Sequence, residues 1–394
     1  MNLNDIKVGI IGGGQLGKML LQEAKKLDLY VCVLAPSKDS PAGRIADELI
    51  IGNLYDGDKI SELVKKCNVT TYEIEHINTE ILCRLEKEGY KIYPSPKILR
   101  TINNKYIQKQ FLRKNNLPTL EFEKNSDLET IASKFGFPFV QKACTGGYDG
   151  RGVKIIKTDK DFENALKCDS FAEKYVEFEK ELAVIVSRGI DGEVQVFPVV
   201  EMMFNYNKNI CDMIICPGRI EKYLAEEAQK LAIKCVELLD GVGVFAIEMF
   251  LTKDNKLLIN EIAPRVHNSG HHTIESCITS QFQQHIRAIC NLPLGATDVI
   301  IPSVMVNILG EEGKNGHPFY KGLNDIMKIS GVNVHIYGKK TVRPFRKMGH
   351  ITVVDKSIAK AFSKATQIKE ILRATSLEGD SYEKQKENWN NNGQ

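Results

Sequence analysis

The residues with which this chain could do chemistry are concentrated between positions 256 and 272. An apolar run at the start of this segment predicts a buried strand, which ends with Asn260 and Glu261 side by side. A second apolar run, residues 243–250, predicts another strand with Glu248 inside it. If the two strands pair antiparallel through the short polar turn between them, Glu248 and Glu261 face each other. Two carboxylates and an amide oxygen suit Mg²⁺ bridging nucleotide phosphates, whereas the alternative is a hairpin with two solvated acids.

The glycine-rich loop 142–153 is the second feature with chemical potential. Four glycines within seven positions leave backbone amides free to approach phosphate oxygens, and Lys142 and Arg151 add positive charge. The loop is expected between two strands, so it is a hairpin loop and not the strand-to-helix loop of a Walker motif. Tyr148 and Asp149 offer directed hydrogen bonds, which a merely flexible surface turn, the alternative reading, does not need.

A strand predicted at residues 171–176 follows this loop. A strand that leaves one subdomain for the next can offer backbone groups to the edge of an adenine ring. Glu181, five positions further on, can accept hydrogen bonds from a ribose. The loop and the strand together therefore predict a nucleotide site.

Residues 12–17 match the pattern G-x-G-x-x-G between a predicted strand and a predicted helix. Such glycines permit a tight turn, and the helix N-terminus can hold a phosphate. A nicotinamide dinucleotide site also needs an acid at the end of the second strand. Here that strand ends in Ala35 and Pro36, and no acid occurs before Asp39. We therefore expect a phosphate-bearing substrate at this loop, with a dinucleotide-dependent oxidoreductase as the alternative.

The composition is that of an ordinary soluble globular protein. The 394 residues are 43% hydrophobic and 26% charged, and a net charge of +3 is too small to argue for nucleic acid or a membrane as partner. Ten scattered cysteines without a CxxC pair are typical of reduced thiols. The sequence has neither a signal-peptide pattern nor a membrane-spanning apolar run. We therefore expect a cytoplasmic protein that acts on small molecules.

Strand and helix patterns alternate through residues 7–95, which predicts a doubly wound parallel sheet. Its strands are expected at 7–12, 30–35, 48–52, 69–74 and 90–93. Helices are expected at 97–116, 223–239 and 274–289, and short strands between 300 and 355. The expected domains are residues 1–98, 99–296 with a lid lobe at about 117–180, and 297–375, followed by a polar tail at 376–394.

In their order along the chain, these features resemble the ATP-grasp ligases, and more narrowly the 5-(carboxyamino)imidazole ribonucleotide synthases. The resemblance runs from about residue 7 to 355, and nine motifs carry it, at 13–17, 71–75, 93–96, 146–152, 260–265, 267–271, 279–282, 292–295 and 343–350. It implies an α/β fold of ATP-grasp architecture. That fold has an N-terminal Rossmann-like domain with a doubly wound parallel sheet, a two-lobed ATP-grasp core and a small, mostly β C-terminal domain.

The resemblance also implies a reaction in which ATP, bicarbonate and 5-aminoimidazole ribonucleotide give the carboxyamino ribonucleotide, ADP and phosphate in purine biosynthesis. Mg²⁺ would be bound by Glu248 and Glu261, with Asn260 close by. ATP would be held by Lys105, Lys142, Gly147, Tyr148, Asp149, Gly150, Arg151, Gly152, Val153, Glu173, Lys174, Tyr175, Val176, Glu181, Phe204, Asn260 and Glu261. The ribonucleotide and bicarbonate would contact Gln15, Leu16, Glu75, Tyr148, Asp149, Arg151, Arg265, His267, Asn268, Ser269, Arg343, Arg346 and Lys347.

Bicarbonate is a poor electrophile, so its oxygen is expected to attack the γ-phosphate first and form carboxyphosphate. That step needs positioning and charge neutralisation. The exocyclic amine of the ribonucleotide must then lose a proton as it takes up the carboxyl group. By its position in the family, Asp149 is the expected base, and Lys347, Arg265 and His267 complete the expected catalytic group.

The chain departs from the family pattern at several site positions. The family usually has Arg at 105, a Thr-Arg pair at 143–144 and His at 204, where this chain has Lys, Ala-Cys and Phe. Pro, Tyr and Gly are usual at 266, 272 and 345, where it has Val, His and Phe. The expected metal ligands, Asp149 and Lys347 are retained, so we expect turnover with altered nucleotide affinity. The remaining alternative is a nucleotide-binding regulatory protein without turnover.

The resemblance further implies a homodimer. It also implies that the product passes to the carboxyaminoimidazole ribonucleotide mutase of the same pathway.

Overall fold

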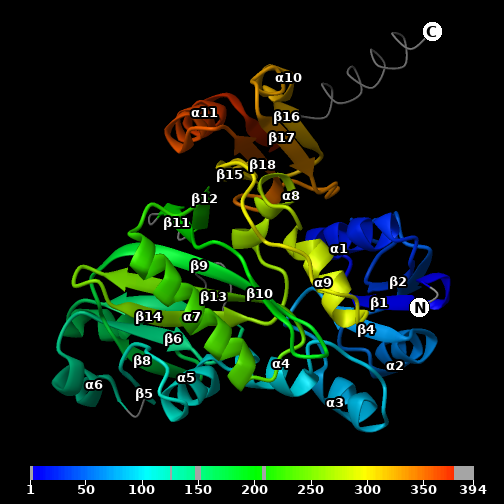
Figure 1. Cartoon of the computed structure of the whole chain (residues 1–394). Coiled ribbons are helices and arrows are strands. Elements are labelled where there is room, and N and C mark those ends of the chain that lie inside the picture. Colours follow the sequence, from blue (N-terminus) through cyan, green and yellow to red (C-terminus); the bar gives the residue numbers. More distant parts are fainter. Residues whose placement is uncertain (1–2, 125–126, 147–151, 206–209, 377–394) are drawn as a thin grey trace. The chain divides into compact units, whose positions relative to one another are not determined.

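The chain divides into two units, Met1–Ile300 and Ile301–Gln394. The computed structural model, drawn in Figure 1, describes residues 3–124, 127–146, 152–205 and 210–376. No helix within these described ranges is long and apolar enough to cross a lipid bilayer.

A parallel sheet with the strand order β3-β2-β1-β4 opens the first unit, as the alternating patterns predict. The predicted strand at 90–93 is wrong. It is reduced to a single bridge between Thr70 and Ile92, because Pro94 has no N–H with which to continue the ladder. The elements here are η1 (Leu3–Asp5), β1 (Lys7–Ile11), α1 (Gln15–Lys26), β2 (Tyr30–Ala35), β3 (Glu48–Ile51), α2 (Gly57–Lys66), β4 (Val69–Tyr72) and α3 (Thr79–Lys87).

The single helix expected at 97–116 is also wrong, because the structure has two, α4 (Pro96–Asn103) and α5 (Lys105–Lys114). Asn104 separates them with φ −102° and ψ 105°, and its side chain accepts hydrogen bonds from the N–H groups of Tyr106 and Ile107. An asparagine that satisfies these free donors starts a new helix. The break matters for the site, because it makes Lys105 the first residue of α5.

A small antiparallel sheet with the order β5-β8-β6-β7 follows. Its strands β6 and β7 pair directly, Lys142 opposite Val153, so the glycine-rich loop joins a hairpin as predicted. Ile131, Phe139, Ile156 and Ala172 form the core between this sheet and its helix. The elements are β5 (Phe122–Lys124), α6 (Leu128–Phe135), β6 (Phe139–Ala143), β7 (Val153–Ile156), η2 (Asp159–Asn164) and β8 (Ser170–Lys174).

The large sheet of the first unit has the antiparallel order β14-β13-β9-β11-β12, with β10 paired to β9. Figure 1 shows α7 lying against it, and residues of α4, α5 and α7 share one buried cluster with β9, β13 and β14. The helix expected at 274–289 is divided, because Ser280 caps a new start. The elements are β9 (Phe178–Arg188), β10 (Val194–Val196), β11 (Val200–Asn205), β12 (Ile210–Cys216), α7 (Lys222–Leu238), β13 (Gly243–Thr252), β14 (Leu257–Ala263), η3 (Asn268–Gly270), α8 (Thr273–Ser276) and α9 (Gln281–Ile289).

The second unit contains the short strands that the sequence predicts between 300 and 355. Strand β18 lies between β15 and β17 in an antiparallel arrangement, and β16 pairs with β19. Helix α11 was not anticipated. The elements are β15 (Ser303–Leu309), β16 (Pro318–Lys321), α10 (Leu323–Ile326), β17 (Val332–Ile336), β18 (Lys347–Val354), α11 (Ile358–Ile371) and β19 (Arg373–Ser376).

Candidate nucleotide and metal site

The two predicted acids face each other. In the hairpin of β13 and β14, Glu248 is the direct partner of Glu261, as the sequence predicts. The register then shifts, so that Met249 pairs with Ile259 and Asn260 is the extra residue of a bulge. Ile259 and Ile262 both belong to the buried core of the sheet. The bulge therefore turns both Asn260 and Glu261 away from that core.

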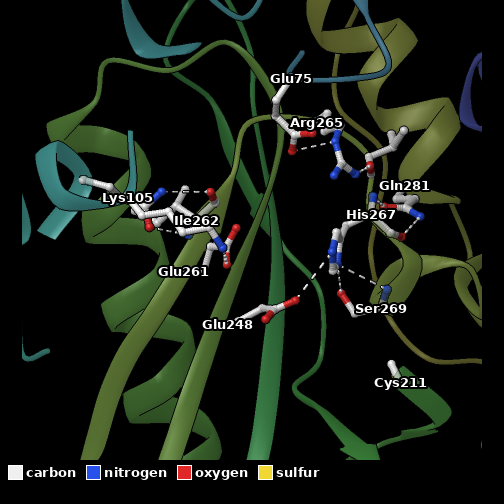
Figure 2. A network of polar contacts seen from close by, with 12 residues as sticks. Glu75, Lys105, Cys211, Glu248, Glu261, Ile262, Arg265, His267, Ser269 and Gln281 are labelled. Atoms are coloured by element: carbon white, nitrogen blue, oxygen red, sulfur yellow. Dashed lines mark hydrogen bonds and ion pairs between the residues drawn. The ribbon is translucent and has the colours of Figure 1, made fainter. Parts of the chain in front are cut away.

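Like charges at directly opposed positions of two strands destabilise a sheet. Each of these carboxylates has a cationic side chain or imidazole beside it, as Figure 2 shows. Lys105 Nζ lies 2.7 Å from Glu261 Oε2, and His267 Nε2 lies 3.5 Å from Glu248 Oε1. Within the described residues no three His, Cys, Asp or Glu side chains form a metal cluster. Two carboxylates and an amide oxygen are hard donors, and this donor set suits Mg²⁺.

Opposite charge holds both members of the Lys105 pair ionised. Burial raises the pKa of Glu261, but Lys105, Lys142 and Arg265 together outweigh burial, and the pKa lies below its ordinary value. Burial likewise lowers the pKa of Lys105, but Glu261, Glu248 and Glu173 together outweigh burial, so that this pKa is raised. The pair supplies one positive and one negative charge where a polyphosphate and its metal need both.

Lys142 connects the glycine-rich hairpin with the two-acid hairpin. Its Nζ donates to Asn260 Oδ1 at 3.0 Å and forms an ion pair with Glu173 Oε2 at 2.6 Å. The other oxygen of Glu173 lies 2.8 Å from Lys109 Nζ. Lys109 is not among the residues predicted from the sequence, although its spacing of four residues from Lys105 places both on one face of α5.

Arg265 and His267 lie on the segment that leaves β14. Arg265 Nε pairs with Glu75 Oε1 at 2.7 Å, and this contact ties the loop after β4 to the site (Figure 2). The N–H of Ser269 donates to His267 Nδ1, so Nε2 carries the proton and points toward Glu248. Gln281 fixes the backbone of His267, since its side chain accepts from the N–H at 2.9 Å and donates to the carbonyl at 2.7 Å.

In the glycine loop at 12–17, a side chain of the same protein binds the backbone amides. The carboxylate of Glu73 accepts hydrogen bonds from Gly14 N–H and, at 2.7 Å, from Gly17 N–H. A Cβ on Gly14 would come within 2.6 Å of Glu73 Oε1. The amides that would bind a phosphate are thus occupied by a side chain, which contradicts the expected phosphate-bearing substrate at these amides and argues equally against the oxidoreductase alternative. Gln15 and Leu16 begin α1 beside this carboxylate.

Other predicted residues are placed as follows. Glu173 and Lys174 end β8, Tyr175 and Val176 form the connection to β9, and Glu181 and Phe204 lie on β9 and β11. Asn268 begins η3, Gly152 directly precedes β7, and Val153 is the first residue of β7. Arg343, Arg346 and Lys347 belong to the second unit. Five predicted residues of the glycine-rich loop lie outside the described residues, namely Gly147, Tyr148, Asp149, Gly150 and Arg151.

Three family models match the chain in succession. They are a ribonucleotide synthetase preATP-grasp domain over residues 6–103, an ATP-grasp domain over 110–282, and a phosphoribosylaminoimidazole carboxylase C-terminal domain over 303–364. These matches confirm the α/β ATP-grasp fold that the resemblance implied.

Two curated relatives cover most of the chain. The phosphoribosylaminoimidazole carboxylase of Ogataea methanolica is 41% identical over 367 residues, which are 89% of this chain and 67% of that protein. The chain thus spans about two thirds of the length of this relative. The N5-carboxyaminoimidazole ribonucleotide synthase of Bacillus subtilis is 40% identical over 352 residues, which are 88% of this chain and 90% of that protein.

Solved structures of the same kind superimpose on the chain. N5-carboxyaminoimidazole ribonucleotide synthetase from Thermotoga maritima is 53% identical with a TM-score of 0.89, covering 94% of this chain and all of that one. N5-carboxyaminoimidazole synthase from Aspergillus clavatus, in complex with ADP and 5-aminoimidazole ribonucleotide, is 36% identical with a TM-score of 0.87, covering 93% of this chain and 98% of that one. The chain therefore belongs to the N5-carboxyaminoimidazole ribonucleotide synthase family, ATP-grasp ligases that convert 5-aminoimidazole ribonucleotide, ATP and bicarbonate to the N5-carboxyamino product in purine biosynthesis.

Proposed function

We propose that this chain carboxylates the amine of 5-aminoimidazole ribonucleotide with bicarbonate, at the expense of ATP and through carboxyphosphate. The observation that carries the proposal is the opposed pair Glu248 and Glu261, with Lys105 and Lys142 directed at the same strand end. Two acids, one amide and two ammonium groups suit a nucleotide polyphosphate with its metal. The Aspergillus clavatus relative was solved with ADP and the ribonucleotide bound.

The chain's own residues take distinct parts in this proposal. Glu248 and Glu261 would hold Mg²⁺, which neutralises phosphate charge when it is bound. Lys105 and Lys142 would bind the phosphates, and the connection after β8 would meet the adenine. Arg265 and His267 would surround bicarbonate. His267 suits this part because Ser269 and Gln281 fix both its ring and its backbone.

The second chemical step needs a base at the amine. The proposal assigns this role to Asp149, with Lys347 keeping it aligned and ionised. The ribonucleotide would also contact Tyr148, Arg151 and Glu75. Arg343 and Arg346 would bind its phosphate, because bidentate guanidinium groups match phosphate oxygens.

The experiment that tests this function is ADP release, measured with bicarbonate and Mg²⁺ in the presence and absence of 5-aminoimidazole ribonucleotide. We expect turnover to depend strongly on the ribonucleotide, because its binding should help to exclude water from the reactive intermediate. Equal rates with glycinamide ribonucleotide or with biotin would refute the assignment. ATP binding without turnover under all these conditions would instead indicate a regulatory protein.

We further propose that the product passes to another enzyme of purine biosynthesis. That enzyme would be the mutase that moves the carboxyl group from nitrogen to carbon. The ten cysteines are scattered along the sequence without a CxxC pair, which supports a reducing compartment such as the cytoplasm. The expected homodimer is open to test by light scattering.

A further inference from the structure

Lys109 is an ammonium group buried beneath the candidate site. Its side chain is 3% exposed, and that of its partner Glu173 is 1% exposed. Besides the ion pair with Glu173, its Nζ donates to Thr119 Oγ1 at 2.8 Å and to the carbonyl of Ile259 at 3.2 Å. A buried charge persists only when it is paired and hydrogen-bonded. Lys109 meets this condition through residues of three separate segments.

The carboxylate of Glu173 is shared between two lysines. Lys109 holds Oε1 at 2.8 Å and Lys142 holds Oε2 at 2.6 Å. Burial opposes the ionisation of Glu173, but the two ammonium groups outweigh burial and lower its pKa to about 2. Two positive charges and one negative charge leave this trio with a net charge of +1. That surplus is available to an incoming phosphate.

The two lysines differ in their access to a ligand. Lys142 is 13% exposed and reaches Asn260, beside the proposed metal ligand Glu261. Lys109 is enclosed, and on this strand its Nζ reaches the carbonyl of Ile259, one residue before Asn260. If Lys142 turns to a phosphate, Lys109 still neutralises Glu173. Without Lys109, the buried carboxylate would have Lys142 as its single cation within the trio.

We propose that Lys109 is a positioning residue that neutralises Glu173 and thereby leaves Lys142 free to bind the nucleotide phosphates. The inference rests on the proposed function for the identity of the nucleotide. It goes beyond that function in assigning a role to a lysine that touches no substrate. In the same contact, Lys109 holds the carbonyl that precedes the bulge of β14.

The test compares Lys109→Met, Glu173→Gln and the double variant. Methionine keeps an unbranched chain of similar length and removes the charge. The trio then carries a net charge of zero in Lys109→Met, +2 in Glu173→Gln, and +1, as in the wild type, in the double variant. Binding of ADP with Mg²⁺ is measured by calorimetry without the other substrates. The KM for ATP and kcat are measured in the complete assay.

We expect Lys109→Met to weaken ADP binding about tenfold or more and to raise the KM for ATP more than it lowers kcat. The reason is that Lys142 stays paired with Glu173, so the nucleotide loses a hydrogen bond from a charged group. Adding Glu173→Gln should restore binding to within about threefold of the wild type, because Lys142 is then no longer held by the buried carboxylate and can turn to the phosphates. A merely structural lysine would give the opposite result, with the double variant weaker than either single one. Lys364→Met, which removes a partly buried pair with Asp355 in the second unit, is the matched control and should bind ADP normally.

Normal ADP binding in Lys109→Met, or a double variant as weak as Lys109→Met, would overturn the inference. If Lys109→Met does not fold, the double variant alone tests the inference. The inference then requires that the double variant folds and binds ADP, and failure of either would overturn it. The outcome is separable from the proposed function. A wild-type chain that binds ADP but shows no ribonucleotide-dependent turnover would refute the function and leave this charge relation standing.

Discussion

Glu248 and Glu261 lie at the same level of two neighbouring strands, where their repulsion costs stability in the absence of a cation. The residues beside them reduce that cost without removing either carboxylate from the site. Lys105 comes from the first turn of α5, and His267 from the loop after β14. At the residue scale, the site therefore has a charge arrangement that favours a cation but remains stable by itself.

We predict that Glu248→Gln and Glu261→Gln each abolish turnover at ordinary Mg²⁺ concentration while the chain stays folded. Each substitution keeps the side-chain shape and removes one charge from a site that must balance a triphosphate. The measurement is the ribonucleotide-dependent rate as a function of Mg²⁺, with circular dichroism as the check on folding. Asp254→Asn, in the exposed turn of the same hairpin, is the control. Near-normal rates with unchanged Mg²⁺ dependence would show that the two acids are only hairpin surface.

At the scale of elements, β14 is the edge strand of the large sheet, and its outer backbone groups need partners. Gln108, on α5, supplies two of them. Its Oε1 accepts from Ile262 N–H at 3.0 Å, and its Nε2 donates to the Ile262 carbonyl at 3.2 Å. Pro118 accepts from Ile259 N–H at 2.8 Å. The edge that carries Asn260 and Glu261 is thus held by side chains and loops in place of another strand.

We predict that Gln108→Leu lowers the free energy of unfolding by about 1–3 kcal/mol, since it leaves a buried N–H and a buried carbonyl without partners. It should also lower turnover, because the strand end that carries Glu261 loses its support. Urea denaturation and the ribonucleotide-dependent rate measure the two effects. Gln110→Leu changes an exposed glutamine of the same helix and should alter neither. Equal stabilities of the two variants would contradict the role given to this edge.

The sequence predicted the elements whose apolar period is long and uninterrupted. The runs that became β13 and β14 placed Glu248 and Glu261 face to face, and the glycine-rich loop was correctly read as a hairpin. It did not predict the bulge at Asn260, because a register shift depends on pairing with a partner strand and leaves no mark in one strand's pattern. It joined α4 and α5 because Asn104 reads as an ordinary polar helix residue until its capping bonds are seen. Lys109 escaped notice because its burial depends on contacts distant in sequence.

At the scale of the whole first unit, α9 connects the N-terminal sheet with the large sheet through one imidazole. His285 Nδ1 accepts from Val244 N–H at 3.0 Å, and its other nitrogen lies 2.8 Å from Thr71 Oγ1. The bond from Val244 leaves the proton on Nε2, so the neutral ring satisfies both contacts. Burial lowers the pKa of His285 to about 3, and that of His272 likewise to about 3.

We predict an acid-dependent loss of stability from these two histidines. Unfolded histidine titrates near pH 6.5, so on unfolding each ring takes up a proton between about pH 6.5 and 3. The stability they contribute is complete above about pH 6.5 and falls as the pH decreases, by up to about 1.4 kcal/mol per pH unit for each ring. Urea midpoints at pH 7 and pH 5 measure the slope. His285→Asn should reduce this slope, the pH dependence of the free energy of unfolding, by the equivalent of about one proton. An unchanged slope would contradict the prediction.

A further prediction concerns Asp149 and Lys347, which are 198 positions apart and which we propose to act in one chemical step. Asp149→Asn should lose carboxylation but keep slow ATP hydrolysis, because carboxyphosphate forms without this proton transfer. Lys347→Ala should behave similarly, and the double variant should be little worse than either single one, as for groups that act as a unit. Product formation and ADP release, measured in parallel, separate the two activities. Losses that multiply in the double variant would refute the shared step.

The carboxylate of Glu73 at Gly14 and Gly17 has an evolutionary consequence. A side chain larger than hydrogen at position 14 would collide with Glu73, and loss of Glu73 would leave two amide donors of α1 unfilled. Positions 14 and 73 are therefore coupled, and a lineage that recruits this loop for a foreign anion must first displace or replace the acid. In this domain the glycine spacing accompanies a carboxylate of the same chain, that of Glu73, and not a bound dinucleotide. Searches that infer dinucleotide enzymes from that spacing should examine position 73 before they assign a cofactor.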